Sequence, residues 1–326
     1  MPRCSTKVWH STAAASTMVK TKSSSSNHHR SSTKTISLEQ IGEASPVFRN
    51  DQMRAKQIAR YVRGRQNKDG GYTFAQWTES SAQDTFFALH ILQLLGIEPE
   101  RRKGTIQFLQ ERQNADGSYD SINVAYYCVS ALSCLGAKPR YNVRDFANSL
   151  KNPHGGFGSL DANIETSSEL ETTYLTLSVL KSFGDVVQDE VIRFILGRMN
   201  RDGTFGRGSG YSRLASVHYA IASLVLLGDD VRSLDRTLEW VRHCELSNGG
   251  FTSDPRDASY LVLEDAYYGL NVLRHFGVGS RSPQASLQLV NRFQNKNGGF
   301  RRSIFMGIST FESTFHALSC LHLLGG

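Results

Sequence analysis

Apolar residues occur in six long runs along this chain, and each run ends at a glycine. Within each run they cover almost every face of a helix, which is typical of a helix buried on most sides. The runs predict helices over residues 83–96, 123–136, 171–184, 215–228, 264–277 and 312–325. Their final glycines lie 40 to 49 residues apart, and a period of this size indicates stacked supersecondary units.

A second helix is predicted ahead of each apolar run. Segments such as AKQIARYVRGRQN and DEVIRFILGRMN have one charged face and one apolar face, which suits an outer layer in contact with water. A glycine turn separates each outer helix from the inner helix that follows. Six such helix pairs predict an all-α fold, and we expect them to form a closed α/α toroid of six helix hairpins.

The turns and the inner-helix starts share a motif. Turns such as QNKDGGY (66–72) and QNKNGGF (294–300) precede helices such as ETTYLTLSVLKSFG (171–184). The motif resembles the prenyltransferase and squalene-cyclase repeat, found in protein prenyltransferase β subunits and in terpene cyclases, and the resemblance covers residues 50–326. It implies a protein that binds a prenyl diphosphate in the toroid cavity and transfers the prenyl group. An acid-initiated terpene cyclase and a non-catalytic toroid that binds a lipid or protein segment are the alternatives.

The first 38 residues have a different composition. They hold six Lys or Arg, no Asp or Glu, and a run of four serines, so we expect a disordered basic tail at 1–38 and the toroid at 39–326. The whole chain has 37 basic and 30 acidic residues, which leaves 31 and 30 outside the tail. We therefore expect no nucleic-acid partner. The sequence also predicts no transmembrane segment, and a cytoplasmic location, with an organellar transit peptide in the tail as the alternative.

Zinc-dependent protein prenyltransferases carry an Asp-x-Cys at one inner-helix start and a histidine at the next. No Asp-x-Cys occurs in this chain, and the positions that match the histidine are Asp265 and Ser313. The ligand pattern thus predicts no zinc, although magnesium would accompany a diphosphate. The five cysteines follow no metal-binding spacing and are expected to be free thiols.

Carboxylates at the inner-helix starts are the candidate catalytic groups. Glu169-Leu170-Glu171-Thr172-Thr173 resembles the acidic motif of the proton-initiated cyclases, and Glu264-Asp265 occupies the same place in the fifth repeat. An acid that protonates an alkene needs burial and a neighbouring carboxylate. The other interpretation is that these acids cap their helices.

Aromatic and basic residues are the candidate binding groups. The aromatic and histidine side chains near the inner-helix starts either pack in the core or line a tunnel for an isoprenoid. Arg207 matches an arginine that the resemblance assigns to the diphosphate, and Arg213 follows it. The predicted substrate-binding residues are Arg207, Arg213, Tyr126, Tyr174, His218, Tyr219, Tyr267 and Phe315. The predicted partners are an isoprenoid or prenyl diphosphate and a helical subunit like the prenyltransferase α subunit.

Overall fold

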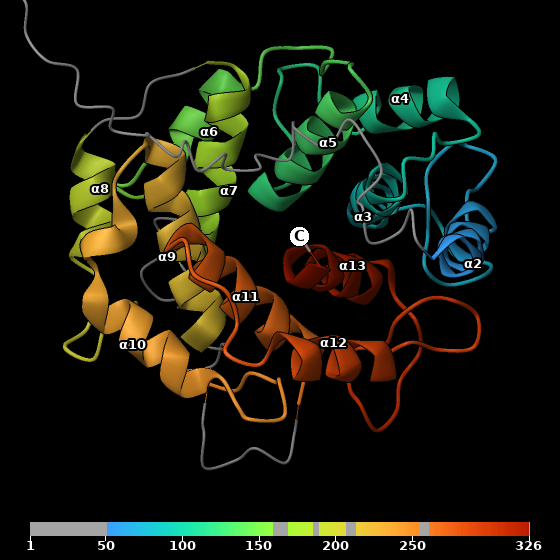
Figure 1. The fold of residues 1–326 in the computed structure, drawn as a ribbon. Coiled ribbons are helices and arrows are strands. Elements are labelled where there is room, and N and C mark those ends of the chain that lie inside the picture. The colour runs from blue at the N-terminus through green and yellow to red at the C-terminus, as the bar shows by residue number, and fades with distance from the viewer. Residues whose placement is uncertain (1–50, 159–168, 185–188, 207–212, 254–260, 326) are drawn as a thin grey trace, which may run out of the picture. The chain divides into compact units, whose positions relative to one another are not determined.

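Six long helices form a ring in the computed structural model of this chain (Figure 1). The structure describes residues 51–158, 169–184, 189–206, 213–253 and 261–325, all in the second of two units, Thr35–Gly326. The predicted tail at 1–38 lies outside the described residues. The inner helices are α3 (Ala82–Leu94), α5 (Ile122–Cys134), α7 (Glu169–Ser182), α9 (Arg213–Leu227), α11 (Leu263–His275) and α13 (Phe311–Gly325).

The inner ring is closed. Each inner helix packs against the next one along the chain, and α13 packs against α3. Their buried faces form one hydrophobic core that runs around the ring. No β-strand occurs in the described ranges, which contain only isolated bridges at the turns. The predicted all-α toroid is confirmed.

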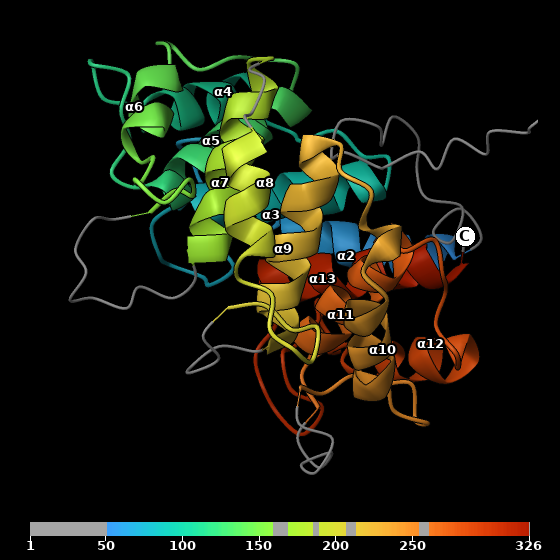
Figure 2. The same ribbon diagram turned by 90° about the vertical axis from the view of Figure 1, so that its left-hand side faces the viewer.

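Shorter helices lie outside the ring, one ahead of each inner helix (Figure 2). Leu109 of α4 and Val241 of α10 are fully buried against the inner layer while charged residues of the same helices face water. Helix α6 is short, with six residues. The outer helices are α2 (Gln52–Arg63), α4 (Arg102–Gln110), α6 (Arg144–Ser149), α8 (Asp189–Leu196), α10 (Asp235–Cys244) and α12 (Pro283–Arg292), with a 3₁₀ turn at Val231–Ser233.

The glycine turn inside a hairpin packs closely against the outer helix of the next hairpin. Gly249 has φ +84°, and a Cβ there would lie 2.2 Å from the backbone nitrogen of Ser286 in α12. Gly298 does the same across the ring closure, because its Cβ would lie 2.7 Å from the Gln57 carbonyl oxygen of α2. Only glycine allows both the left-handed backbone and this close approach.

A buried threonine ties three of the turns to their inner helices. The backbone N–H groups of Tyr72, Phe157 and Phe300 donate to the hydroxyls of Thr85, Thr173 and Thr314 at 2.9, 3.1 and 3.0 Å. Each donor belongs to the buried aromatic residue that follows the turn glycines. The threonine of the sequence motif therefore satisfies a buried N–H group.

We expect Thr173→Val to lower the free energy of unfolding by about 1–3 kcal/mol, because it leaves the Phe157 N–H buried and unpaired. Urea unfolding measures the effect. Thr176→Val is the matched control: Thr176 is equally buried in α7, but its hydroxyl donates to the Thr172 carbonyl, a helix group that keeps its backbone partner. Equal losses in both variants would contradict this role for Thr173.

Candidate functional site

Six aromatic side chains, one from each inner helix, form a closed ring inside the toroid. Neighbours around the ring have centroids 5.4 to 6.4 Å apart, all the way from the first repeat to the sixth and back. They occupy the same position in every repeat, so the six helices run parallel and in register. We call this set the aromatic hexad: Phe86, Tyr126, Tyr174, His218, Tyr267 and Phe315.

The next residue of each helix builds a second aromatic layer. Phe87 lies 6.0 Å from Tyr127 and 6.2 Å from His316, and Tyr268 lies 6.0 Å from Tyr219. Leu175 takes this position in the third repeat. The six aromatic residues predicted to bind substrate thus lie together in these two layers.

The tyrosines of the hexad are neutral. Burial, reinforced by neighbouring tyrosine hydroxyls, raises the pKa of Tyr126 and of Tyr267 far above the usual range. An interior lined by neutral aromatic rings favours an apolar ligand, and the faces of the rings attract a positive charge.

Two histidines in these layers have an unpaired nitrogen. His218 and His316 are buried, and Nδ1 of each has no hydrogen-bond partner. Burial lowers the pKa of both to about 3, so both are neutral. His316 stacks on Tyr267 with centroids 4.3 Å apart.

Three glutamates lie one helical turn outside the hexad. Glu171, Glu264 and Glu312 each come three residues before the hexad residue of their helix, so they share a face with it. Together with Asp84 of the first repeat they place four carboxyl groups at the end of the ring where the inner helices begin.

The pKa of Glu312 is raised from 4.5 to about 7. Burial is the largest cause, the negative charges of Glu264, Asp84 and Glu171 add to it, and Arg302 opposes it. Burial also raises the pKa of Glu171 and of Asp84. A cluster of poorly solvated carboxyls holds a proton near neutral pH because its members cannot all ionise.

Hydrogen bonds fix two members of this cluster. The Tyr219 hydroxyl donates to Glu171 Oε1 at 3.1 Å, which opposes the rise of the Glu171 pKa. Arg302 donates to Glu264 Oε2 from Nη2 at 2.8 Å and from Nε at 3.1 Å. Both carboxylates therefore bond to groups on other segments of the ring, whatever they contribute to their own helix ends.

Other predicted catalytic residues lie elsewhere. Glu169 forms an ion pair with Arg198 at 2.6 Å, and its side chain is half exposed. Asp265 is buried, and its charge helps burial to raise the pKa of Cys244 in α10. Asp265 therefore lies near outer helix α10.

Of the two arginines predicted to bind a diphosphate, only Arg213 lies in the described part of the chain. Arg213 lies 3.8 Å from Asp202 in a half-exposed ion pair. Arg207 lies outside the described residues. Their proposed role in binding substrate stays a prediction.

Sequence reasoning missed the importance of Glu312. Glu312 opens its helix as Glu171 and Glu264 do, but the motif comparison selected the third and fifth repeats. The sequence does contain a signal for it, because Glu171, Glu264 and Glu312 occupy the same position in their repeats.

Within the described ranges, no group of three or more His, Cys, Asp or Glu side chains is arranged to hold a metal ion. Cys128, Cys244 and Cys320 are buried free thiols, as expected. The predictions that zinc is not used and that magnesium accompanies a diphosphate stay predictions.

The chain is similar in sequence to known proteins. The prenyltransferase alpha-alpha toroid domain matches residues 35–124, 117–261 and 258–326. A drimenyl diphosphate synthase from Streptomyces showdoensis is 26% identical over 233 residues, which cover 63% of this chain and only 43% of that enzyme.

Solved structures share the fold. Candida albicans protein geranylgeranyltransferase-I, solved with GGPP, has a TM-score of 0.63 at 20% identity, covering 82% of this chain and 90% of its own. A type II terpene cyclase from Scytonema, solved with geranylgeranyl dihydroxybenzoate, has a TM-score of 0.58 at 11% identity, covering 86% and 97%. No helix in the described part of the chain is long and apolar enough to cross a membrane.

We expect Glu312 to make the protein less stable as the pH rises from about 4.5 to about 7. In this window the folded protein keeps a proton that the unfolded chain has released, so the free energy of unfolding falls with pH. Glu312→Gln should remove a pH dependence of about 1–3 kcal/mol, since the side chain is still partly solvated.

Urea unfolding across this pH range tests the assignment. Glu239→Gln, at an exposed site on α10, is the control for loss of one carboxylate. A wild-type pH profile that Glu312→Gln leaves unchanged would show that Glu312 titrates normally.

Proposed function

Because the chain belongs to the prenyltransferase alpha-alpha toroid family, we propose that it is an enzyme that cyclises an isoprenoid by protonating one of its double bonds. One observation carries this proposal: a carboxyl with a pKa of about 7, Glu312, lies one helical turn from a closed aromatic hexad. A carboxyl with this pKa is still partly protonated at neutral pH and can donate its proton. The faces of the aromatic rings stabilise the carbocation that forms.

Glu312 is the proposed acid. Its O–H bond breaks, and the proton adds to one alkene carbon while the cation forms on the other. Burial, together with the charges of Glu264, Asp84 and Glu171, keeps the proton on Glu312 until an alkene accepts it. The carboxylate left behind is next to Arg302, whose positive charge favours the ionised form.

The aromatic layers are the proposed site of ring formation. A neighbouring double bond of the isoprenoid attacks the cation and forms a carbon–carbon bond, so the charge moves along the chain past the hexad. A proton then leaves a carbon next to the final cation for the unpaired Nδ1 of His218 or His316, which gives a cyclic isomer of the substrate. Neutral rings stabilise each cation by electrostatic attraction.

Prenyl transfer to an acceptor was the first hypothesis from sequence. The raised pKa of Glu312 favours the cyclase, since a transferase that activates its acceptor with a metal has no need of a protonated carboxyl at this place. The roles predicted for Arg207, Arg213, Glu169 and Asp265, and for a helical partner subunit, stay predictions.

The test is incubation of the full chain with geranyl, farnesyl and geranylgeranyl diphosphates in D₂O, with metal content measured beforehand and products identified by mass spectrometry. We expect a cyclic product that carries one deuterium from solvent on carbon. Glu312→Gln should reduce its formation by about 10²–10⁴-fold.

Glu169→Gln is the matched control, because Glu169 begins an inner helix but pairs with Arg198 away from the cluster. It should leave the rate within a few-fold of wild type. Cyclic products without deuterium, or transfer of the prenyl group to an added thiol or peptide, would contradict the proposal.

A further inference from the structure

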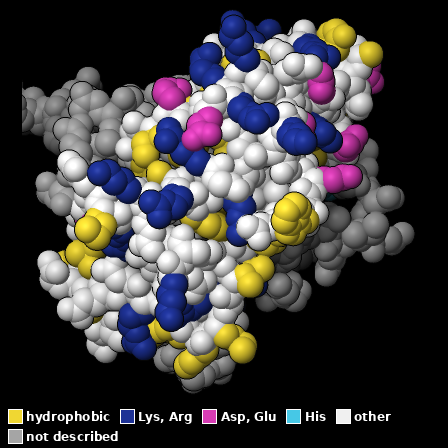
Figure 3. All heavy atoms as spheres, turned by 90° about the vertical axis from the view of Figure 1, so that its right-hand side faces the viewer, with side chains coloured by type: hydrophobic (Ala, Val, Ile, Leu, Met, Phe, Trp, Pro, Cys, Tyr) yellow, Lys and Arg dark blue, Asp and Glu magenta, His cyan; other side chains and the backbone are white. Residues whose placement is uncertain are grey.

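The outer helices differ in charge around the ring. Three consecutive ones, α12, α2 and α4, contain Lys and Arg but no Asp or Glu, whereas α6, α8 and α10 contain both signs. Figure 3 views the molecule from the side of α2 and shows Lys and Arg spread over it, with fewer acidic groups. The basic residues of the three helices are Arg54, Lys56, Arg60, Arg63, Arg102, Lys103 and Arg292.

Contacts hold the three helices together as one surface. Gln57 of α2 donates to the Lys296 carbonyl just after α12 at 2.8 Å, and Gly70 after α2 packs on Gly104 of α4. The surface is therefore continuous across the point where the ring closes. We call it the basic face.

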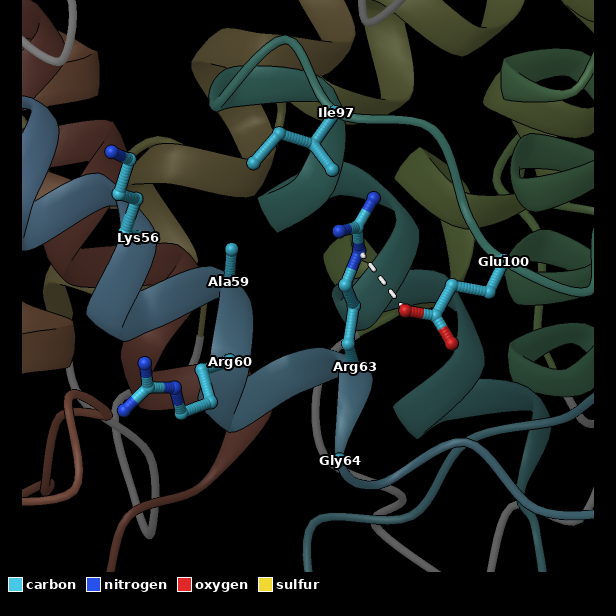
Figure 4. Close-up of a pocket in the computed structure, with 7 residues that line it drawn as sticks. All are labelled: Lys56, Ala59, Arg60, Arg63, Gly64, Ile97 and Glu100. Atoms are coloured by element: carbon cyan, nitrogen blue, oxygen red, sulfur yellow. Dashed lines mark ion pairs between the residues drawn. The ribbon is translucent and has the colours of Figure 1, made fainter.

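A surface depression of about 460 Å³ lies in the basic face, beside α2 (Figure 4). Three basic residues, Lys56, Arg60 and Arg63, and one acidic residue, Glu100, line it. Arg63 lies 3.7 Å from Glu100. Lys56 and Arg60 are exposed and make no ion pair or side-chain hydrogen bond among the described residues, so their charges are available to an anion.

Exposed apolar side chains accompany these charges. Seven large hydrophobic residues are exposed in the described ranges, and five belong to α2 or to the two loops next to it. The loops are held at the end of α2, where Tyr61 donates to the Ser309 carbonyl and the Thr73 N–H donates to the Arg65 carbonyl. The five, between 69% and 98% exposed, are Met53, Trp77, Phe305, Met306 and Ile308.

We propose that the basic face binds the surface of an anionic lipid bilayer. Lys56 and Arg60 would contact lipid phosphates, and the exposed side chains of the two loops would enter the headgroup region. Basic residues interspersed with exposed Trp, Phe and Ile are the composition of surfaces that bind membranes peripherally. Nucleic acid would match the charge but would leave Phe305, Met306 and Ile308 in water.

The proposal rests on this surface and is independent of the proposed chemistry. Lys and Arg near an anionic bilayer each strengthen binding severalfold, and the effect is screened by salt. Binding of this kind would place the protein at the lipid bilayer, in which long isoprenoids dissolve.

Sedimentation with vesicles tests the proposal, using the full chain and phosphatidylcholine vesicles with or without phosphatidylserine. We expect binding only to the anionic vesicles at physiological salt, and a shift of Trp77 fluorescence to shorter wavelength. Lys56→Gln combined with Arg60→Gln should weaken binding by more than about tenfold.

Arg193→Gln combined with Arg236→Gln is the matched control, because it removes two exposed arginines from α8 and α10 and leaves the basic face intact. Every variant keeps the basic residues at 1–38, so a difference between the two pairs reports on the basic face. Trp77→Ser should also weaken binding and should abolish the fluorescence shift.

Three outcomes would overturn the proposal. The first is no binding of wild type to anionic vesicles. The second is an equal loss in both double variants, which would reflect net charge alone. The third is retention on duplex DNA, lost in Lys56→Gln with Arg60→Gln, in a protein that ignores vesicles.

Discussion

Packing of each inner helix on the next is the constraint on which this structure depends. Because the sequence of contacts returns from α13 to α3, equivalent positions of all six helices face one interior. A residue type repeated at one position thus becomes a layer. The aromatic hexad is such a layer, and the carboxyl cluster is a partial one, with acids in some repeats and not in others.

The chemistry of the site follows from this layering. Each of the six aromatic residues is ordinary by itself, but together they form a closed, uncharged ring. Because water is excluded from this ring, the pKa of its tyrosine hydroxyls is raised and they stay protonated. The same exclusion acts in the same direction at the carboxyl layer, where it raises the pKa of Glu312. There it meets several like charges, and one proton is retained.

Much of this fold was predictable from sequence, because the inner helices are long, apolar and end at glycines. Their observed ends fall within about two residues of the predicted ends, and the final glycine of the first five has a left-handed conformation. The site was less predictable. Glu264 and Asp265 are adjacent in sequence, yet a helix turns about 100° per residue, so Glu264 bonds to Arg302 while Asp265 lies near Cys244 of α10. The pKa of Glu312 depends on acids from three other repeats, and no single segment contains that information.

Ring closure has a consequence for how such a protein forms and changes. An open solenoid gains a similar interface with every added repeat and can be lengthened or shortened one unit at a time. Here Gly298 of the last hairpin packs on α2 of the first, across more than two hundred residues. The first and last repeats must therefore find each other before either is complete, which favours slow, all-or-none folding. Loss of a single repeat would require every remaining helix to change its angle to its neighbours.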